Sequence, residues 1–206
     1  MNLGRASYRG DAAGARKAVE DGADVNAAVF TPDGTMGGTR TAAHLAAWNH
    51  HGGVLGVLLA DPVNADPDKG DTSTKHTPLH AAFRINSHGN LQTIAVLLAH
   101  GADANRSDMW GMTPCMYAAA TGKLDCTRVR SDGKRCLQAL AEGAARQGRE
   151  LDVNAVNAEG ETALDIVLGD SDFDEVAIYL RDELGALRAA DLPPSRKPPK
   201  SASKKR

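Results

Sequence analysis

Two short sequence motifs alternate along almost the whole chain, and this repetition constrains the fold more than any other feature. The first is a tetrapeptide that begins with a threonine, at Thr41, Thr77, Thr113 and Thr162. The second precedes the tetrapeptide and reads Gly22-Ala23-Asp24-Val25-Asn26 in one copy and Gly101-Ala102-Asp103-Ala104-Asn105 in another. A motif pair that recurs at such spacings indicates a repeat protein, in which each unit packs against its neighbours.

Each threonine of the first motif stands where a helix is expected to begin, because its hydroxyl accepts a hydrogen bond from the free N–H groups of a first helical turn. Pro78 and Pro114 directly follow their threonines, and proline is favoured at the first position of a helix. Gly22 and Gly101 stand where a second helix should end in a left-handed residue. Apolar residues lie at helical spacing between the motifs, so each unit is predicted to contain two short helices.

These residues and motifs resemble the ankyrin repeat, in which a hairpin finger is followed by two antiparallel helices. The resemblance covers residues 2 to about 187. It implies an all-α fold with short β-hairpin fingers, an ankyrin-repeat α-solenoid of about five repeats. It also implies that His44 and His80, in the fourth position of their tetrapeptides, bind neighbouring backbone groups and threonine hydroxyls. We expect an ankyrin-repeat domain over 1–187, with repeats at about 2–26, 27–66, 67–105, 106–154 and 155–187.

The first and fourth repeats depart from the standard length. The first lacks a finger, as expected of a terminal cap, and its helices are predicted at about 3–8 and 12–20. The fourth, 106–154, is longer than the roughly 33 residues of an ordinary unit. Its excess includes the polar stretch 127–134 and residues around 146–150. The residues around 146–150 form either an extended second helix or a loop.

The segment 188–206 differs in composition from the repeats. From residue 193 onward it contains four prolines and no apolar residue larger than alanine, so we predict a disordered tail. This tail is a nuclear address, a tether to nucleic acid or another anionic surface, or simply a solubilising terminus. Its basic residues are Arg196, Lys197, Lys200, Lys204, Lys205 and Arg206.

Composition argues against several classes of protein. No stretch approaches the roughly 18 apolar residues of a membrane-spanning helix, and the first residues lack the apolar core of a secretory signal. The three cysteines are an odd number, which favours reduced thiols and a cytoplasmic location, with the nucleus open through the basic tail. Of the 24 basic residues six lie between 193 and 206, so residues 1–192 hold the other 18 against 26 acidic ones. We therefore expect no broad contact with nucleic acid.

The motifs give no support for catalysis. Gly122-Lys123 suggests a phosphate loop, but the glycine five positions earlier and the following serine or threonine are both missing. No nucleophile, base and orienting group can be assembled from the motifs. We expect no enzymatic activity, no cofactor and no metal site.

The resemblance places the fingers and the exposed ends of the first helices on one concave face. Several large side chains fall there without a structural role in the repeat pattern. Tryptophan and arginine are enriched among residues that dominate binding energy, and methionine adapts to irregular partners. The predicted partner-binding residues are Trp110, Met109, Met112, Trp48 and Arg84.

We therefore predict a non-enzymatic protein–protein interaction module, an adaptor, scaffold or inhibitor, that binds another protein through its concave face. We expect it to be a monomer, and its partner is not identifiable from the sequence. The alternative is a translocated or nuclear-targeted effector that uses the basic tail as an address or as a tether to an anionic surface or nucleic acid.

Overall fold

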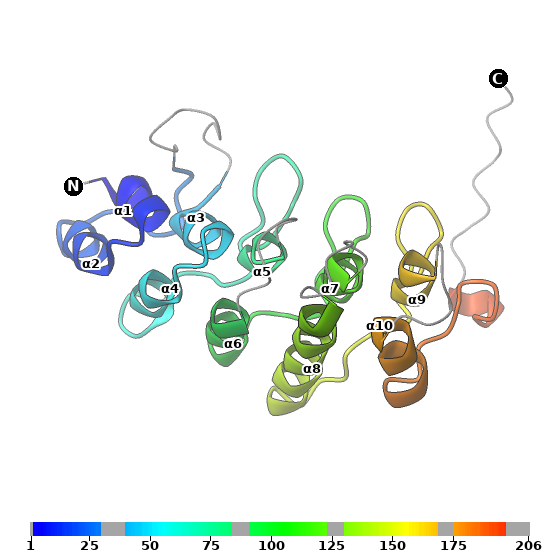
Figure 1. Ribbon diagram of the computed structural model, residues 1–206. Helices are drawn as coiled ribbons and strands as arrows, with labels where there is room; N and C mark the ends of the chain where they lie inside the picture. Colours follow the sequence, from blue (N-terminus) through cyan, green and yellow to red (C-terminus); the bar gives the residue numbers. More distant parts are fainter. Residues whose placement is uncertain (1, 30–39, 84–90, 123–129, 169–174, 197–206) are drawn as a thin grey trace, which may run out of the picture.

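The computed structural model describes residues 2–29, 40–83, 91–122, 130–168 and 175–196. Within these ranges the chain forms ten α-helices in two rows of a solenoid (Figure 1). One row contains α1 (Leu3–Arg9), α3 (Ala42–Trp48), α5 (Pro78–Ala81), α7 (Pro114–Gly122) and α9 (Ala163–Val167). The other contains α2 (Ala12–Glu20), α4 (Gly52–Leu59), α6 (Leu91–Ala99), α8 (Arg130–Arg146) and α10 (Glu175–Ile178).

Loops project from the edge of the solenoid on which the first row lies, and we call them fingers (Figure 1). The fourth finger is closed by a 3.0 Å hydrogen bond from the Asp108 N–H to the Met112 carbonyl. The described ranges contain no strand, and their one isolated bridge joins Val29 to Arg40. The all-α prediction is thus confirmed, while the described fingers are tight turns rather than β-ladders. The fingers named below are the third, 66–76, the fourth, 103–112, and the fifth, 152–161.

The helix boundaries predicted from the two motifs are confirmed. Pro78 and Pro114 are the first residues of α5 and α7. Gly22 and Gly101 follow the second helices of their units with φ angles of 90° and 88°, a conformation that glycine adopts without a steric penalty. The short helices predicted in the first unit are α1 and α2.

The core is one continuous series of small packing layers that runs along the solenoid from Leu3 to Ala186. Alanines of the first helices let neighbouring units approach closely, and larger side chains of the second helices fill the space between the two rows. The buried alanines include Ala42, Ala43, Ala46, Ala47, Ala81, Ala82, Ala118 and Ala119. The buried larger residues include Leu55, Leu58, Ile94, Leu97, Leu137 and Leu140.

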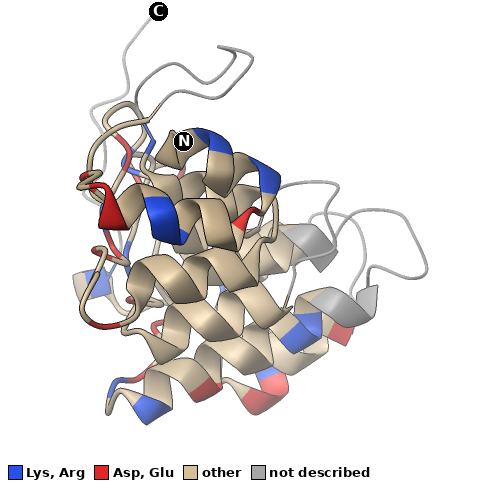
Figure 2. Cartoon of the chain, turned by 90° about the vertical axis from the view of Figure 1, so that its left-hand side faces the viewer, with Lys and Arg blue, Asp and Glu red and all other residues tan. Residues whose placement is uncertain are grey.

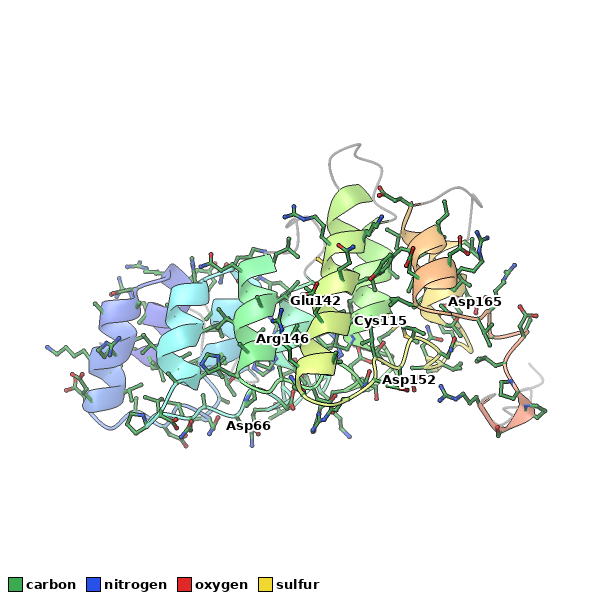
Figure 3. All side chains as sticks on the ribbon, turned by 90° about the horizontal axis from the view of Figure 1, so that it is seen from below. Asp66, Cys115, Glu142, Arg146, Asp152 and Asp165 are labelled. Carbon is green, nitrogen blue, oxygen red and sulfur yellow. The ribbon has the colours of Figure 1, made fainter. Side chains whose placement is uncertain are left out.

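The extra length of the fourth unit lies partly in its second helix. Helix α8 is 17 residues long and ends at Arg146, so the loop is the correct alternative for the residues that follow it. The chain then turns through 147–150. Residues 127–129 of the polar stretch lie outside the described ranges. Figure 3 shows Glu142 and Arg146 on the exposed face of α8, where their side chains form a 3.1 Å ion pair.

Two glycines inside second helices offer a matched test of this packing. A Cβ atom at Gly143 in α8 would lie 2.6–2.9 Å from three atoms of Leu98, whereas one at Gly56 in α4 would meet nothing within 4 Å. We expect Gly143→Ala to lower the free energy of unfolding by about 1–3 kcal/mol through overpacking. Gly56→Ala should raise it by roughly 0.5–1 kcal/mol, because alanine is the better helix former. Urea unfolding measures both changes. If the two substitutions changed the free energy of unfolding equally and in the same direction, this packing would be contradicted.

A ladder of side-chain to backbone hydrogen bonds joins successive units. In three rungs an asparagine of the second motif accepts from a backbone N–H of the next unit, and in the other one Asp68, which follows that motif, accepts from the Asp103 N–H. Asp66 and Asp152, which donate at two rungs, lie in the loops between units (Figure 3). The rungs are Asn26 Oδ1 to Asp66 N (2.9 Å), Asp68 Oδ1 to Asp103 N (2.9 Å), Asn105 Oδ1 to Asp152 N (2.7 Å) and Asn154 Oδ1 to Leu187 N (2.7 Å).

The chain after α10 continues the pattern of the repeats before it leaves the solenoid. The Ala186 N–H binds the Leu180 carbonyl at 2.8 Å, as the Ala102 N–H binds the Leu97 carbonyl at 3.1 Å. The Thr162 hydroxyl donates to the Leu187 carbonyl at 2.9 Å. Beyond residue 187 the Ala189 N–H donates to Asp165 Oδ2 at 2.7 Å, so the predicted domain boundary falls inside a segment that contacts the last unit.

Of the predicted tail residues, only Arg196 lies within the described ranges. It belongs to a short 3₁₀ turn, Pro194–Arg196, and its guanidinium is 2.8 Å from Asp152 Oδ1. Outside the described residues are Lys197, Lys200, Lys204, Lys205 and Arg206.

Candidate functional site

The fourth finger is held in place by one buried carboxylate, that of Asp108. Its side chain is 0% exposed. Oδ1 accepts from the N–H groups of Trp110 at 2.8 Å and Met112 at 2.9 Å. Oδ2 accepts from the Tyr117 hydroxyl at 3.0 Å and lies 3.1 Å from His76 Nε2. The turn that carries Trp110 is thereby fixed to α7 and to the third finger.

Aromatic rings surround this carboxylate and join three elements of the fold. His76 of the third finger stacks on His80 with ring centroids 5.6 Å apart, and it meets the rings of Trp110 and Tyr117 edge-on at 5.7 Å each. Burial, followed by the charge of Asp108, raises the pKa of Tyr117. The Tyr117 hydroxyl therefore stays protonated and donates to the carboxylate. We call His76, His80, Asp108, Trp110 and Tyr117 the finger cluster.

Two buried histidines, His44 of α3 and His80 of α5, each link their helix to the finger of the next unit. The Thr41 N–H donates to His44 Nδ1 at 3.1 Å, so the ring proton must be on Nε2, which lies 2.7 Å from the His76 carbonyl. His80 repeats the pattern with Thr77, and its Nε2 lies 3.1 Å from the Met112 carbonyl. The backbone and threonine contacts that the resemblance implied for both histidines are confirmed. Burial lowers the pKa of each imidazole to about 4.

The structure separates the predicted partner-binding residues into two places. Met109 and Trp110 are exposed at the fourth finger, by 54% and 46%, and Met112 is half-buried beside them. Trp48 lies two units away at the end of α3, with the Arg40 guanidinium 4.5 Å above its ring. Arg84 lies outside the described residues.

A cleft of about 430 Å³ opens between the fourth and fifth fingers, and we call it the finger cleft. Trp110 and Met112 of the fourth finger and Ile166 of α9 contribute apolar groups to its lining. Glu159 and Glu161 bring carboxylates to it. The complete lining is Trp110, Met112, Asn157, Ala158, Glu159, Glu161 and Ile166. The cleft thus joins a large aromatic surface to negative charge.

Figure 2 looks along the solenoid from its N-terminal end and shows that the stacked helices are largely uncharged, with charged residues towards the margins. Within the described ranges, no three histidine, cysteine or acidic side chains come together as metal ligands. Cys115 and Cys136 are buried free thiols, and burial, followed by the charge of Asp152, raises the pKa of Cys115 to about 12. Cys126 lies outside the described residues.

Sequence reasoning assigned Asp108 to the turn but missed His76 and Tyr117, although a signal for the pairing of His76 with Asp108 was present. His76 directly precedes a threonine of the first motif, as Arg40 does one unit earlier. Asp108 likewise corresponds to Asp71, which lies 3.8 Å from Arg40. In both cases the last residue of one finger pairs with the aspartate of the next finger, Arg40 with Asp71 and His76 with Asp108. An alignment of the fingers would have shown this recurrence.

The fold and the site define a class, a helical repeat protein that displays a firmly held finger beside a cleft. A family model described as ankyrin repeats (3 copies) matches residues 43–129. This part of the chain therefore belongs to the ankyrin repeat family, as its motifs predicted. Proteins of this family generally bind other proteins and are typically non-catalytic. In the ranges that the structure describes, no helix is long and apolar enough to cross a membrane.

Proposed function

We propose that this chain is a non-enzymatic adaptor, scaffold or inhibitor that binds a partner protein through its fingers, with Trp110 at the centre of the interface. The observation that carries the proposal is that Trp110 has an exposed side chain on a firmly held backbone. Its side chain is 46% exposed, yet its backbone is held by Asp108 at 2.8 Å. A large aromatic group is thus displayed on a turn that is already ordered.

Order in the free protein favours binding, because less conformational entropy is lost when the partner arrives. Tryptophan contributes a large contact area with few rotatable bonds, and it is enriched among the residues that dominate binding energy. Met109 stands beside it, 54% exposed, and a methionine side chain adapts to the shape of a partner. These properties support a contact surface centred on the fourth finger.

Trp110→Ala should weaken partner binding on the order of 30- to 1,000-fold, because truncation of a central hot spot typically costs about 2–4 kcal/mol. The matched control is Ile178→Ala on α10, which removes a similarly exposed apolar side chain (41%) outside the finger cleft. Both variants and the wild type serve as bait, and the dissociation constants of the proteins captured by the wild type are then measured. The thermal midpoint of each variant is recorded in parallel.

Loss of affinity in Trp110→Ala, with Ile178→Ala unchanged and both midpoints within a few degrees of the wild type, supports the interface. If the wild type and both variants bind equally well, the partner binds at another surface of the protein. A large fall in the midpoint of Trp110→Ala would mean that the ring acts mainly inside the finger cluster, with His76.

The proposed location is the cytoplasm. This is supported by an odd number of cysteines and by the burial of Cys115 and Cys136 as free thiols, which need no oxidising compartment. Entry into the nucleus through the basic tail is a separate prediction. It is tested by the distribution of the full chain after its tail lysines and arginines are replaced by glutamine.

A further inference from the structure

We propose that the finger cleft receives a lysine or arginine side chain from a basic segment of the partner protein. This inference rests on the proposed function and gives the chemistry of the partner. It follows from the rigidity of the cleft, from the groups that line it, and from an arginine–tryptophan contact elsewhere in the same molecule.

The two fingers that form the cleft are fixed to one another. The Ala158 N–H donates to the Trp110 carbonyl at 2.8 Å. Gly111 has a φ angle of 74°, and a Cβ atom there would lie 3.1 Å from the Asn157 Cα. The backbones of the fourth and fifth fingers therefore approach as closely as a glycine permits, and the cleft has a defined shape before a ligand enters.

Asn157 orders the turn that carries the two glutamates of the cleft. Its side-chain oxygen accepts from the N–H groups of Glu159 at 3.0 Å and Glu161 at 2.8 Å. Its side-chain amide donates to Glu161 Oε2 at 3.2 Å. Asn157 is nearly buried and its polar groups are occupied, so it positions the glutamates. Among the described residues, neither glutamate forms an ion pair with a lysine or arginine.

The lining of the cleft also contains apolar and aromatic side chains, those of Trp110, Met112 and Ile166. Lysine and arginine match both kinds of lining residue, because their methylene stems pack on apolar surface while the charged group reaches a carboxylate. A cation over an indole ring adds a further attraction. An acidic side chain would be repelled by both glutamates, and an apolar one would remove their water without replacing it.

The molecule already contains an arginine–tryptophan contact of this kind. The Arg40 guanidinium lies 4.5 Å above the Trp48 ring and 3.8 Å from the carboxylate of Asp71. Arg40 thus combines aromatic and acidic contacts, as the incoming side chain would in the finger cleft. There, Trp110 and the glutamates offer the aromatic and acidic groups, and no described lysine or arginine occupies the position of Arg40.

The test uses the full chain and four capped pentapeptides, Ala-Ala-Xaa-Ala-Ala, in which Xaa is lysine, arginine, glutamine or glutamate. Binding is followed by the NMR signal of the Trp110 indole N–H, assigned by comparison with Trp48→Phe. We expect saturable shifts with the lysine and arginine peptides, at least fivefold weaker binding of the glutamine peptide, and weaker binding still of the glutamate peptide.

The double variant Glu159→Gln, Glu161→Gln should bind the lysine peptide at least fivefold more weakly than the wild type, since it retains the shape of the cleft without its charge. The control Glu183→Gln changes an exposed glutamate after α10 and should bind as the wild type does. Equal affinity for the lysine and glutamine peptides, or unchanged affinity in the double variant, overturns the proposal.

Two further outcomes separate the sources of the basic side chain. If replacing the tail's lysines and arginines with glutamine strengthens lysine-peptide binding several-fold, the tail of this chain competes for the cleft, and the partner is not its occupant. If Trp110→Ala captures the same partners as the wild type, the proposed function fails, and the assignment of the basic segment to a partner fails with it. If that variant loses its partners while the peptides show no preference for cations, only the present inference fails.

Discussion

Replacing Asp108 with alanine should lower the free energy of unfolding by roughly 3–5 kcal/mol. The variant removes the acceptor of two backbone N–H groups and of the Tyr117 hydroxyl, and it deprives His76 of its carboxylate partner. Buried polar groups that lose a charged partner keep the cost of their desolvation without the compensating hydrogen bonds. Chemical unfolding of the full chain measures this loss. The Trp110 indole signal should also broaden or move, because its turn loses its anchor.

Two other substitutions make this measurement specific. Asp108→Asn keeps an oxygen for the N–H groups of Trp110 and Met112, so its effect should be smaller. Asp191→Ala removes an exposed aspartate near the end of the described chain and should change stability by less than about 0.5 kcal/mol. An effect of Asp108→Ala no larger than that of Asp191→Ala would mean that the fourth finger is not held by this carboxylate.

Lowering the pH from 7 to 5 should destabilise the protein by roughly 4 kcal/mol through His44 and His80 alone. Their pKa falls from an ordinary value of 6.5 to about 4 in the folded protein, and burial is the main cause. Between these two values the unfolded chain binds protons that the folded chain does not, so stability falls as the pH decreases. At pH 5 the difference is about 2 kcal/mol per histidine. The thermal midpoint should fall by about 10 °C.

The double variant His44→Gln, His80→Gln identifies the source of this pH dependence. It should be less stable than the wild type at pH 7, since both bridges to the next finger change, but its midpoint should vary much less between pH 7 and 5. The aspartates with a lowered pKa, Asp71 and Asp165, lose their contributions only below about pH 4. An equally steep fall in the double variant would assign the effect to other groups.

The helices were predictable from the sequence because their signals are local. A threonine cap, a proline in the first helical position or a glycine at a helix end acts on the neighbouring turn, so Pro78, Pro114, Gly22 and Gly101 locate four boundaries without knowledge of the tertiary structure. The residue at which α8 ends was not predictable, because the sequence of residues 146–150 is compatible with a helix or a loop. The close approach of Gly143 to Leu98 was not predictable, because it depends on how two units pack and local sequence patterns carry no information on that packing.

The candidate site was predictable only in its exposed part. Trp110 and Met109 stood out because they had no structural role in the repeat pattern, and both are exposed. The finger cluster joins residues of different units, as His76 and Asp108 do across 32 positions of sequence. Such a pairing depends on the register of neighbouring fingers. The finger cleft likewise needs the fourth and fifth fingers side by side, although Trp110 and Glu159 are distant in the chain.

The ladder of asparagine and aspartate rungs has a direction with a consequence for synthesis. In all four rungs the residue that is earlier in the chain supplies the side-chain oxygen and the later one supplies the N–H group. Because a ribosome makes the chain from its N-terminus, each acceptor exists before its donor emerges. Every nascent unit thus presents a docking point for the one that follows, and the solenoid can be completed in the order of translation. The sequence Gly185-Ala186-Leu187-Arg188-Ala189 resembles the second motif but has alanine where Asn105 and Asn154 stand, so it offers no acceptor for a further rung.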